Sequence, residues 1–234
     1  MTELPTVEAV SWKKAARIIR SVYPPIDLFE DIADPEDWPA IIAAEQKTNP
    51  RLIETIGEID SVEPSRRVGG PGASYLMAPF THVSADKQGR FSDGTFGVLY
   101  VGKTYEVALF ETVHHHAKFM ASTNEPEGWT AQFREIVLDV DAELHRLDPV
   151  SHAPLLMADS YVESQAFAVL AKRAGSNGLL YPSARLPEGQ CVALFYPDCA
   201  SNPVQGRHLE YHWNGDSVDM IKDCGSGQVF RLEA

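Results

Sequence analysis

The stretch Gly89–His116, which reads GRFSDGTFGVLYVGKTYEVALFETVHHH, constrains the fold of this chain more than any other part. Its apolar and aromatic run Gly94–Tyr100 begins with glycine, which is typical of a buried strand, and Gly102 ends the run. Thr104 then offers a hydroxyl that can accept hydrogen bonds from the free amides at the start of a helix. A strand, a turn and a helix in one short stretch, with Arg90 just before the strand, predict the core of a functional site.

Glu111 lies in the middle of that helix, among the apolar residues Val107, Ala108, Phe110 and Val113. A charged side chain is rarely buried without a partner. Because a helix has about 3.6 residues per turn, Glu111 and His115 lie on one face, where a carboxylate and an imidazole can meet or face the same cleft. Glu111 is therefore the candidate catalytic carboxylate. The alternative is a structural carboxylate paired with an arginine.

Three further side chains are candidates for binding a ligand. Arg90 carries a planar guanidinium, which can hold a phosphate through two parallel hydrogen bonds, although it could also be a surface residue. Tyr100 is either a core residue or a ring that stacks on a heteroaromatic ligand. Ser183 lies on the loop between two short apolar runs, Gly178–Tyr181 and Gln190–Tyr196, which we predict to be strands. Loops held between rigid strands often carry binding groups, and the alternative is a plain loop serine.

The three consecutive histidines, His114, His115 and His116, do not predict a metal site. Adjacent helical side chains point about 100° apart, so the three cannot converge on one ion, and the chain has no HExxH or CxxC motif. We expect one of them to pack near Glu111 and the others to face solvent. A serine hydrolase with Ser183 and His115 is also disfavoured, because the Gly-x-Ser-x-Gly motif is absent and a proline precedes the serine.

The charge of the chain excludes some classes of partner. Among 234 residues, 20 are Lys or Arg and 33 are Asp or Glu, which gives a net charge of −13 and would repel a nucleic-acid backbone. A basic partner protein is easier to accommodate. No run approaches the roughly 20 apolar residues needed to cross a bilayer, and the N-terminus lacks signal-peptide features, so we expect a cytoplasmic protein without membrane contact. Three cysteines without CxxC spacing predict free thiols.

The N-terminal part is predicted to be helical. Ser11 can cap a helix through WKKAARIIRSVY, whose apolar residues repeat at helical spacing until Pro24-Pro25 ends it. Asp34-Pro35 starts a second helix that runs to Asn49-Pro50 by the same reasoning. We therefore predict a helical N-terminal extension over residues 1–63, which is either a structural addition or a surface for a partner.

The remaining segments mix strands and helices. From Arg66 the chain is rich in glycine, but its GGPG run is a weak phosphate-loop signal because no Gly-Lys-Ser/Thr follows and no clear helix begins there. The alternating pattern of Trp129–Asp141 predicts a strand with one buried face, and Asp159-Ser160 opens an amphipathic helix that Gly175 ends. The Asn214-Gly215 pair indicates a hairpin between closing antiparallel strands.

The order of these motifs resembles the RES-domain family, named for its Arg, Glu and Ser. Arg90, then Tyr100 at the end of a strand, then Glu111 after ALF, and Ser183 in GLLYPSARLPEGQCVALFYP carry the resemblance. The upstream YPPIDLFEDIADPEDW also looks like the N-terminal region of proteobacterial members, so the resemblance covers most of the chain. It implies an α+β catalytic domain over residues 64–234, with a small mixed or antiparallel sheet similar to that of ADP-ribosylating toxins. No GxGxxG motif follows a strand, so we do not expect a Rossmann domain.

The resemblance further implies an enzyme that cleaves the nicotinamide–ribose bond of NAD⁺. It implies that Glu111 stabilises the positive charge that develops on the ribose, while Arg90 grips the pyrophosphate, Tyr100 contacts the nicotinamide end and Ser183 binds ribose or phosphate. Family members usually begin their first strand with an arginine, which we assign to Arg67. This residue either contacts a ligand phosphate or forms a surface or structural ion pair.

The acceptor of the ADP-ribosyl group is left open. A protein side chain would make the chain a mono-ADP-ribosyltransferase, water an NAD⁺ glycohydrolase, and phosphate an NAD⁺ phosphorylase. A non-catalytic nucleotide-binding or interaction protein is the rival from another class. NAD⁺ is thus expected as a substrate, and no metal is expected.

RES proteins are typically the toxin half of toxin–antitoxin pairs. The resemblance therefore implies a protein antitoxin with an Xre-like module, which blocks the entrance to the Glu111 cleft within an oligomeric complex.

Overall fold

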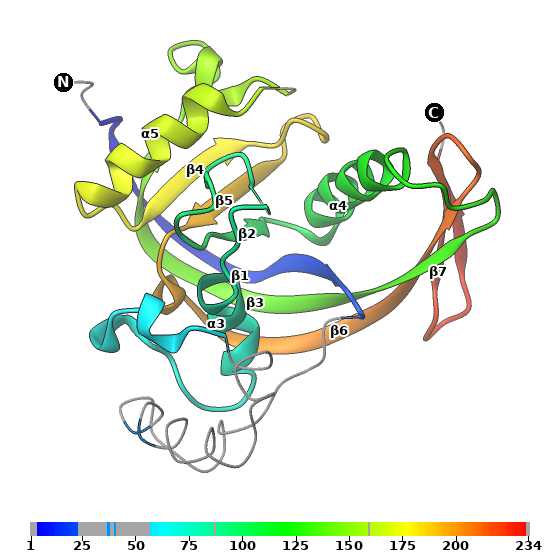
Figure 1. The fold of residues 1–234 in the computed structure, drawn as a ribbon, viewed down its shortest axis with the longest axis horizontal. Helices are drawn as coiled ribbons and strands as arrows, with labels where there is room; N and C mark the ends of the chain where they lie inside the picture. Colours follow the sequence, from blue (N-terminus) through cyan, green and yellow to red (C-terminus); the bar gives the residue numbers. More distant parts are fainter. Residues whose placement is uncertain are drawn as a thin grey trace.

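A mixed eight-stranded sheet with the order β1-β2-β5-β4-β3-β6-β7-β8 forms the centre of the molecule (Figure 1). The computed structural model describes residues 4–22, 37, 40, 57–86, 88–158 and 160–232. The strands are β1 (Val7–Arg20), β2 (Leu99–Gly102), β3 (Thr130–Arg146), β4 (Gly178–Pro182), β5 (Gln190–Leu194), β6 (Ala200–Trp213), β7 (Val218–Asp223) and β8 (Val229–Arg231). The helices are α3 (Ala73–Thr81), α4 (Tyr105–Met120) and α5 (Val162–Arg173). None of the described helices is long and apolar enough to span a bilayer.

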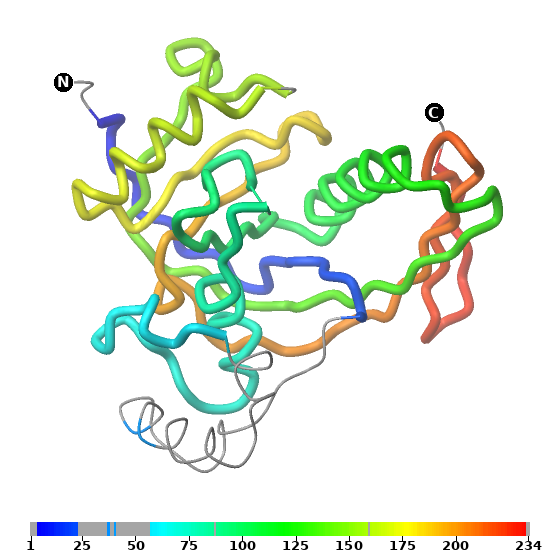
Figure 2. Tube along the Cα trace, in the orientation of Figure 1, coloured from blue at the N-terminus to red at the C-terminus, as the bar shows by residue number. Residues whose placement is uncertain are grey.

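The strand pairings close part of the sheet into a ring. β1 pairs with both β2 and β3, so β1, β2, β5, β4 and β3 follow one another around the ring, and β6, β7 and β8 extend the sheet from β3. Among the strand pairs of the described residues, only β3 and β4 run parallel, with His145 opposite Leu179. β1 lies along β3 over most of its length (Figure 2). These pairings confirm the α+β class and the mixed sheet, which has more strands than the small sheet we expected.

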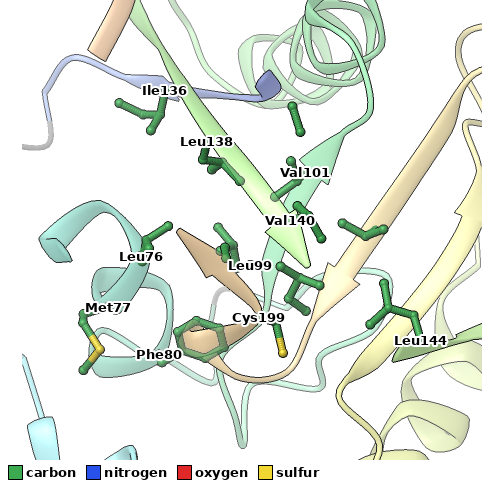
Figure 3. Packing of buried hydrophobic residues seen from close by; sticks show 14 of the residues in the cluster. Leu76, Met77, Phe80, Leu99, Val101, Ile136, Leu138, Val140, Leu144 and Cys199 are labelled. Carbon is green, nitrogen blue, oxygen red and sulfur yellow. The ribbon is translucent and has the colours of Figure 1, made fainter. Parts of the chain in front are cut away.

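The largest core cluster lies between α3 and the strands of the ring. Successive strand residues point to opposite faces, so β2 directs Leu99 and Val101 into this cluster. Leu138 of β3 and Phe80 of α3 pack in the same cluster (Figure 3). Tyr100, between the two apolar residues of β2, instead packs beside the second cluster, which α5 covers. The alternation of β2 therefore places one side chain on the side opposite the main core.

The helix predicted from Ser11 is wrong, because this segment forms β1. A β-bulge interrupts the strand between Trp12 and Ala15, where Lys14 has a left-handed φ of 57°. The bulge shifts the period-2 alternation, so that the face of Trp12 continues at Ala15, three residues later, while Ala16 is buried in another cluster on the opposite face. The shifted pattern mimics helical spacing. The predicted domain boundary at residue 63 therefore separates β1 from the other strands of the same sheet. The second predicted helix, from Asp34-Pro35, lies outside the described residues apart from positions 37 and 40.

Two other local predictions are corrected. Within the run Gly94–Tyr100 the strand begins only at Leu99 and continues to Gly102, because Ser92 Oγ holds the preceding residues in a turn through the amide of Gly94 (3.2 Å) and the carbonyl of Phe96 (2.6 Å). A helix, α3, does begin after GGPG, with Gly72 at its N-cap in the left-handed region (φ 78°). The predicted starts of α4, α5 and β3 and the strands β4 and β5 are confirmed within a few residues, and the Asn214-Gly215 pair joins the antiparallel strands β6 and β7 as predicted.

Candidate active site

A cleft lies beside the contact between β1 and β2. In the described residues the two strands are paired only at Ala16 and Gly102, and both residues line the cleft. The cleft has a volume of about 280 Å³. Its polar lining brings together four of the residues singled out in the sequence, which are Arg90, Tyr100, Glu111 and His115.

Glu111 is held in this cleft by the loop after β4. The Oγ atom of Ser183 donates a hydrogen bond to Glu111 Oε1 (2.6 Å), and the amide of Ala184 donates to the same oxygen (3.2 Å). The amides of Arg185 and Leu186 in turn donate to Ser183 Oγ, each at 3.1 Å. Neither bond to the carboxylate uses Oε2. The loop therefore orients Glu111 through Oε1, and these bonds leave the lone pairs of Oε2 unused.

The start of α4 agrees with the sequence prediction. Thr104 is the N-cap residue, and its Oγ1 accepts a hydrogen bond from the amide of Val107 (3.4 Å). Glu111 follows two turns later on the helix face toward the cleft, because Val107 and Ala108 are buried against the sheet. The cap thus sets where the helix begins and, with it, the face on which Glu111 lies.

α5 positions the backbone around Arg90. Ser164 Oγ donates to the carbonyl of Arg90 (2.6 Å), and Gln165 Nε2 donates to the carbonyl of Gly89 (2.9 Å). The guanidinium of Arg90 donates to the carbonyl of Met157 (2.6 Å) and lies 5.0 Å from the ring centroid of Tyr161. Arg90 is therefore placed at the cleft by a helix that is distant in the chain, since Arg90 and Ser164 are 74 residues apart.

Tyr100 holds the same loop from the other side. Its Oη accepts a hydrogen bond from the amide of Phe91 (2.9 Å), and burial raises the pKa of the Tyr100 hydroxyl, so it stays protonated at neutral pH. A Cβ atom on Gly89 would lie only 2.7 Å from this Oη atom. Glycine at position 89 therefore permits the close contact that fixes Arg90. The contact with a nicotinamide ring stays a prediction.

A second arginine, Arg17 of β1, also lines the cleft and was missed in the sequence, because the bulged strand was interpreted as a helix.

Arg67, to which we assigned the arginine of the first strand, is not among the residues that line the cleft. Its Nε donates to the carbonyl of Val62 (2.9 Å), and its Nη2 pairs with Asp60 (3.3 Å), while the side chain is only 3% exposed. The structure favours the structural ion pair for Arg67.

The three histidines have different environments. His115 lines the cleft, as its spacing from Glu111 predicts, and partial removal from water lowers its pKa, while Glu111 acts to raise it. His116 is buried against Phe133, with ring centroids 4.9 Å apart, so the expectation that it faces solvent is wrong. No group of three or more metal-ligating side chains exists in the described part of the chain.

His116 predicts a pH-dependent stability. Burial, reinforced by Arg20, lowers the pKa of His116 from 6.5 to about 4 in the folded protein. As the pH falls from 6.5 to 4, the unfolded chain binds a proton that the folded chain does not, so the free energy of unfolding falls by roughly 2 to 3 kcal/mol from this group. In urea titrations across this range, His116→Phe should flatten the pH dependence, whereas His208→Gln, at an exposed position, should not. Equal slopes for all three proteins would contradict the prediction.

The cysteines are all free, as predicted. Cys191 lines the cleft, but burial raises the pKa of its thiol to about 12, with the nearby Glu111 acting in the same direction. A thiol in this state is protonated at neutral pH and is a poor nucleophile. Cys191 therefore belongs to the cleft wall.

A second cavity of about 230 Å³ adjoins the cleft. The two share Arg17, Gly89 and Tyr100 in their walls. The second cavity extends between the end of α3 and the turn before β2, where it is lined by His82, Ser84 and Ser92, among others. The two cavities thus meet at Arg17, at Tyr100 and at the backbone of Gly89, which has no side chain to separate them.

Three comparisons relate the chain to known proteins. A family model described as RES domain matches residues 64–214. Uncharacterized protein y4oC of Sinorhizobium fredii is 24% identical over 209 residues, which cover 88% of this chain and 85% of that protein. The crystal structure of the M. tuberculosis MbcT–MbcA toxin–antitoxin complex is matched with a TM-score of 0.42 at 12% identity, over 85% of this chain and 86% of that chain.

Proposed function

The chain belongs to the RES domain family, and from this premise we propose that it is an NAD⁺-cleaving toxin of a toxin–antitoxin pair. The observation that carries the proposal is the carboxylate of Glu111, oriented by Ser183 and facing a cleft lined by Arg17 and Arg90. The family resemblance implies the reaction, and the cleft supplies the side chains that the reaction needs.

The charges in the cleft support an anionic substrate. The protein carries a net charge of −13, yet Arg17 and Arg90 both line this one cleft. A cleft with low-dielectric walls concentrates the field of its own charges, so a substrate phosphate meets a local positive potential despite the net charge. The two adjoining cavities, which share Arg17 in their walls, also match a ligand with two ring systems joined by a pyrophosphate.

The reaction breaks the bond between C1′ of the ribose and the nicotinamide nitrogen. The bonding electrons leave with nicotinamide, which becomes neutral, and positive charge develops on the ribose in an oxocarbenium-like transition state. Glu111 stabilises this charge, a contribution that is usually the largest in such sites. Arg90 holds the pyrophosphate, and Tyr100 keeps the Arg90 loop in place through the amide of Phe91. Ser183 acts through Glu111 by orienting its Oε1 atom.

A nucleophilic atom of the acceptor then forms a bond to C1′ in place of nicotinamide, and this atom loses its proton. We propose that this acceptor is a side chain of a cellular protein, so that the product is a mono-ADP-ribosylated protein. Water, which would give free ADP-ribose, and phosphate, which would give ADP-ribose 1″-phosphate, are the alternatives that the assay distinguishes.

The proposed partner is a protein antitoxin with an Xre-like module that covers the cleft in an oligomeric complex. The rim of the cleft supports a protein partner, since the exposed apolar residue Met157 lies there, with its carbonyl bound to Arg90. Val162 at the start of α5 is also exposed and apolar. Such residues favour contact with another protein surface when they adjoin a functional cleft.

The proposal is tested by incubating the purified protein with NAD⁺ labelled in its adenylate half. We expect free nicotinamide to appear and a labelled protein band to form when cell extract is added. Label in ADP-ribose or its phosphate, without a band, would replace the transferase by the glycohydrolase or the phosphorylase. Adding the product of the neighbouring gene should suppress the release. If labelled NAD⁺ binds but no nicotinamide appears with any acceptor, the chain is a non-catalytic nucleotide-binding protein.

A further inference from the structure

We infer that Arg185 is a second phosphate-binding residue, which shares the pyrophosphate of the substrate with Arg90. The inference rests on the proposed function and deepens it. Arg185 lies on the loop that carries Ser183, and nothing in the motif order or in the cleft lining described above assigns it a role.

The two guanidinium groups meet at one short segment. Arg90 Nη1 donates to the carbonyl of Met157 (2.6 Å), and Arg185 Nη2 lies 3.5 Å from the carbonyl oxygen of Ala158. These carbonyls belong to consecutive residues, whose Cα atoms are about 3.8 Å apart. Two cations from different loops therefore bind the same short segment, and one of them, Arg90, lines the cleft. Their mutual repulsion is relieved when a dianion binds between them.

The side chain of Arg185 also has unused donor capacity. Its Nε atom is buried and has no hydrogen-bond partner among the described residues. A buried donor without a partner is unfavourable, and a turn of the side chain toward a phosphate oxygen would satisfy it. The bonds of Arg185 and Arg90 to carbonyls are to neutral acceptors, whereas a phosphate oxygen is itself charged and can accept two parallel bonds from one guanidinium. A substrate phosphate can therefore displace the two carbonyls.

The backbone of Arg185 is tied to the candidate catalytic carboxylate. Its amide donates to Ser183 Oγ (3.1 Å), and Ser183 Oγ donates to Glu111 Oε1 (2.6 Å). The same short chain of bonds therefore fixes both the carboxylate and the base of the arginine. In agreement with this placement, both Arg185 and Arg90 act to lower the pKa of His115, which lines the cleft.

The test compares two substrates that contain the same scissile bond. Nicotinamide riboside has the nicotinamide–ribose bond but no phosphate. Arg185→Gln should raise KM for NAD⁺ by about 10- to 100-fold, the effect of losing a charge-assisted hydrogen bond, and leave kcat/KM for nicotinamide riboside unchanged. Arg185→Lys should lie between, because lysine keeps the charge but not the planar pair of donors. Arg146→Gln, at an exposed position outside the cleft, is the matched control.

Two results would overturn the inference. Equal losses with both substrates would mean that Arg185 braces the loop that orients Glu111, and an unchanged KM for NAD⁺ would mean that it does not contact phosphate. Calorimetric binding of ADP-ribose gives a readout without catalysis, and Arg185→Gln should raise its Kd by the same factor. If the wild-type protein binds ADP-ribose through Arg185 but releases no nicotinamide, the proposed reaction fails while this inference stands. If Arg185→Gln leaves the Kd unchanged, the inference fails.

Discussion

Glu111→Gln is expected to lower the rate of nicotinamide release by about 10²- to 10³-fold, the loss typical of removing one electrostatic contact to a transition state. Glutamine keeps the size of the side chain, and its carbonyl oxygen can still accept the bond from Ser183 Oγ. The substitution therefore removes the negative charge and leaves the loop in place. KM for NAD⁺ should change little, because Glu111 acts on charge that develops only in the transition state.

Glu106→Gln is the matched control for this prediction, since Glu106 lies on the same helix, in its first turn, with its side chain exposed. In growing bacteria the wild-type chain and Glu106→Gln should both stop growth, whereas Glu111→Gln should not. Full nicotinamide release by Glu111→Gln would show that another carboxylate carries the reaction. Glu188, on the Ser183 loop, would then be the next candidate, although it is exposed and is not among the residues that line the cleft.

Leu99→Ala is expected to lower the free energy of unfolding by about 2 to 5 kcal/mol, which is the usual range for a buried leucine. Leu99 is 0% exposed and packs in the cluster between β2, β3 and α3 (Figure 3). The loss combines the transfer of the missing methyl groups to water with the cavity that remains, because neighbouring strands cannot close around it. Urea titration measures the change directly.

Val204→Ala is the control for the core substitution, because Val204 is 63% exposed on β6 and should change stability by less than about 0.5 kcal/mol. Since Leu99 and Tyr100 point to opposite faces of β2, folded Leu99→Ala should still release nicotinamide. A loss of less than about 1 kcal/mol would mean that the core relaxes around the cavity.

The sequence by itself determined the local parts of the site. The cap at Thr104, the shared face of Glu111 and His115, and the strands on either side of the Ser183 loop all follow from short-range periodicity and hydrogen bonds between near neighbours. The α+β class was implied by the family resemblance. The order of Arg90, Tyr100, Glu111 and Ser183 was enough to place the chain in its family.

Only the tertiary structure decided which of these groups meet. Glu111 and Ser183 are 72 residues apart, and Arg90 and Met157 are 67 apart, so no local pattern predicts either bond. Strand order brings the first pair together, because β2 and β4 both pair with β5, and the packing of α5 on the Arg90 loop accompanies the second. The bulge at Lys14 shows the same limit, since one left-handed residue shifts the two-residue alternation for the rest of the strand. Arg17 could be assigned to the site only from the pairing of β1 with β2 and β3. Pairing partners, and not the periodicity of one segment, decide whether such a segment forms a strand or a helix.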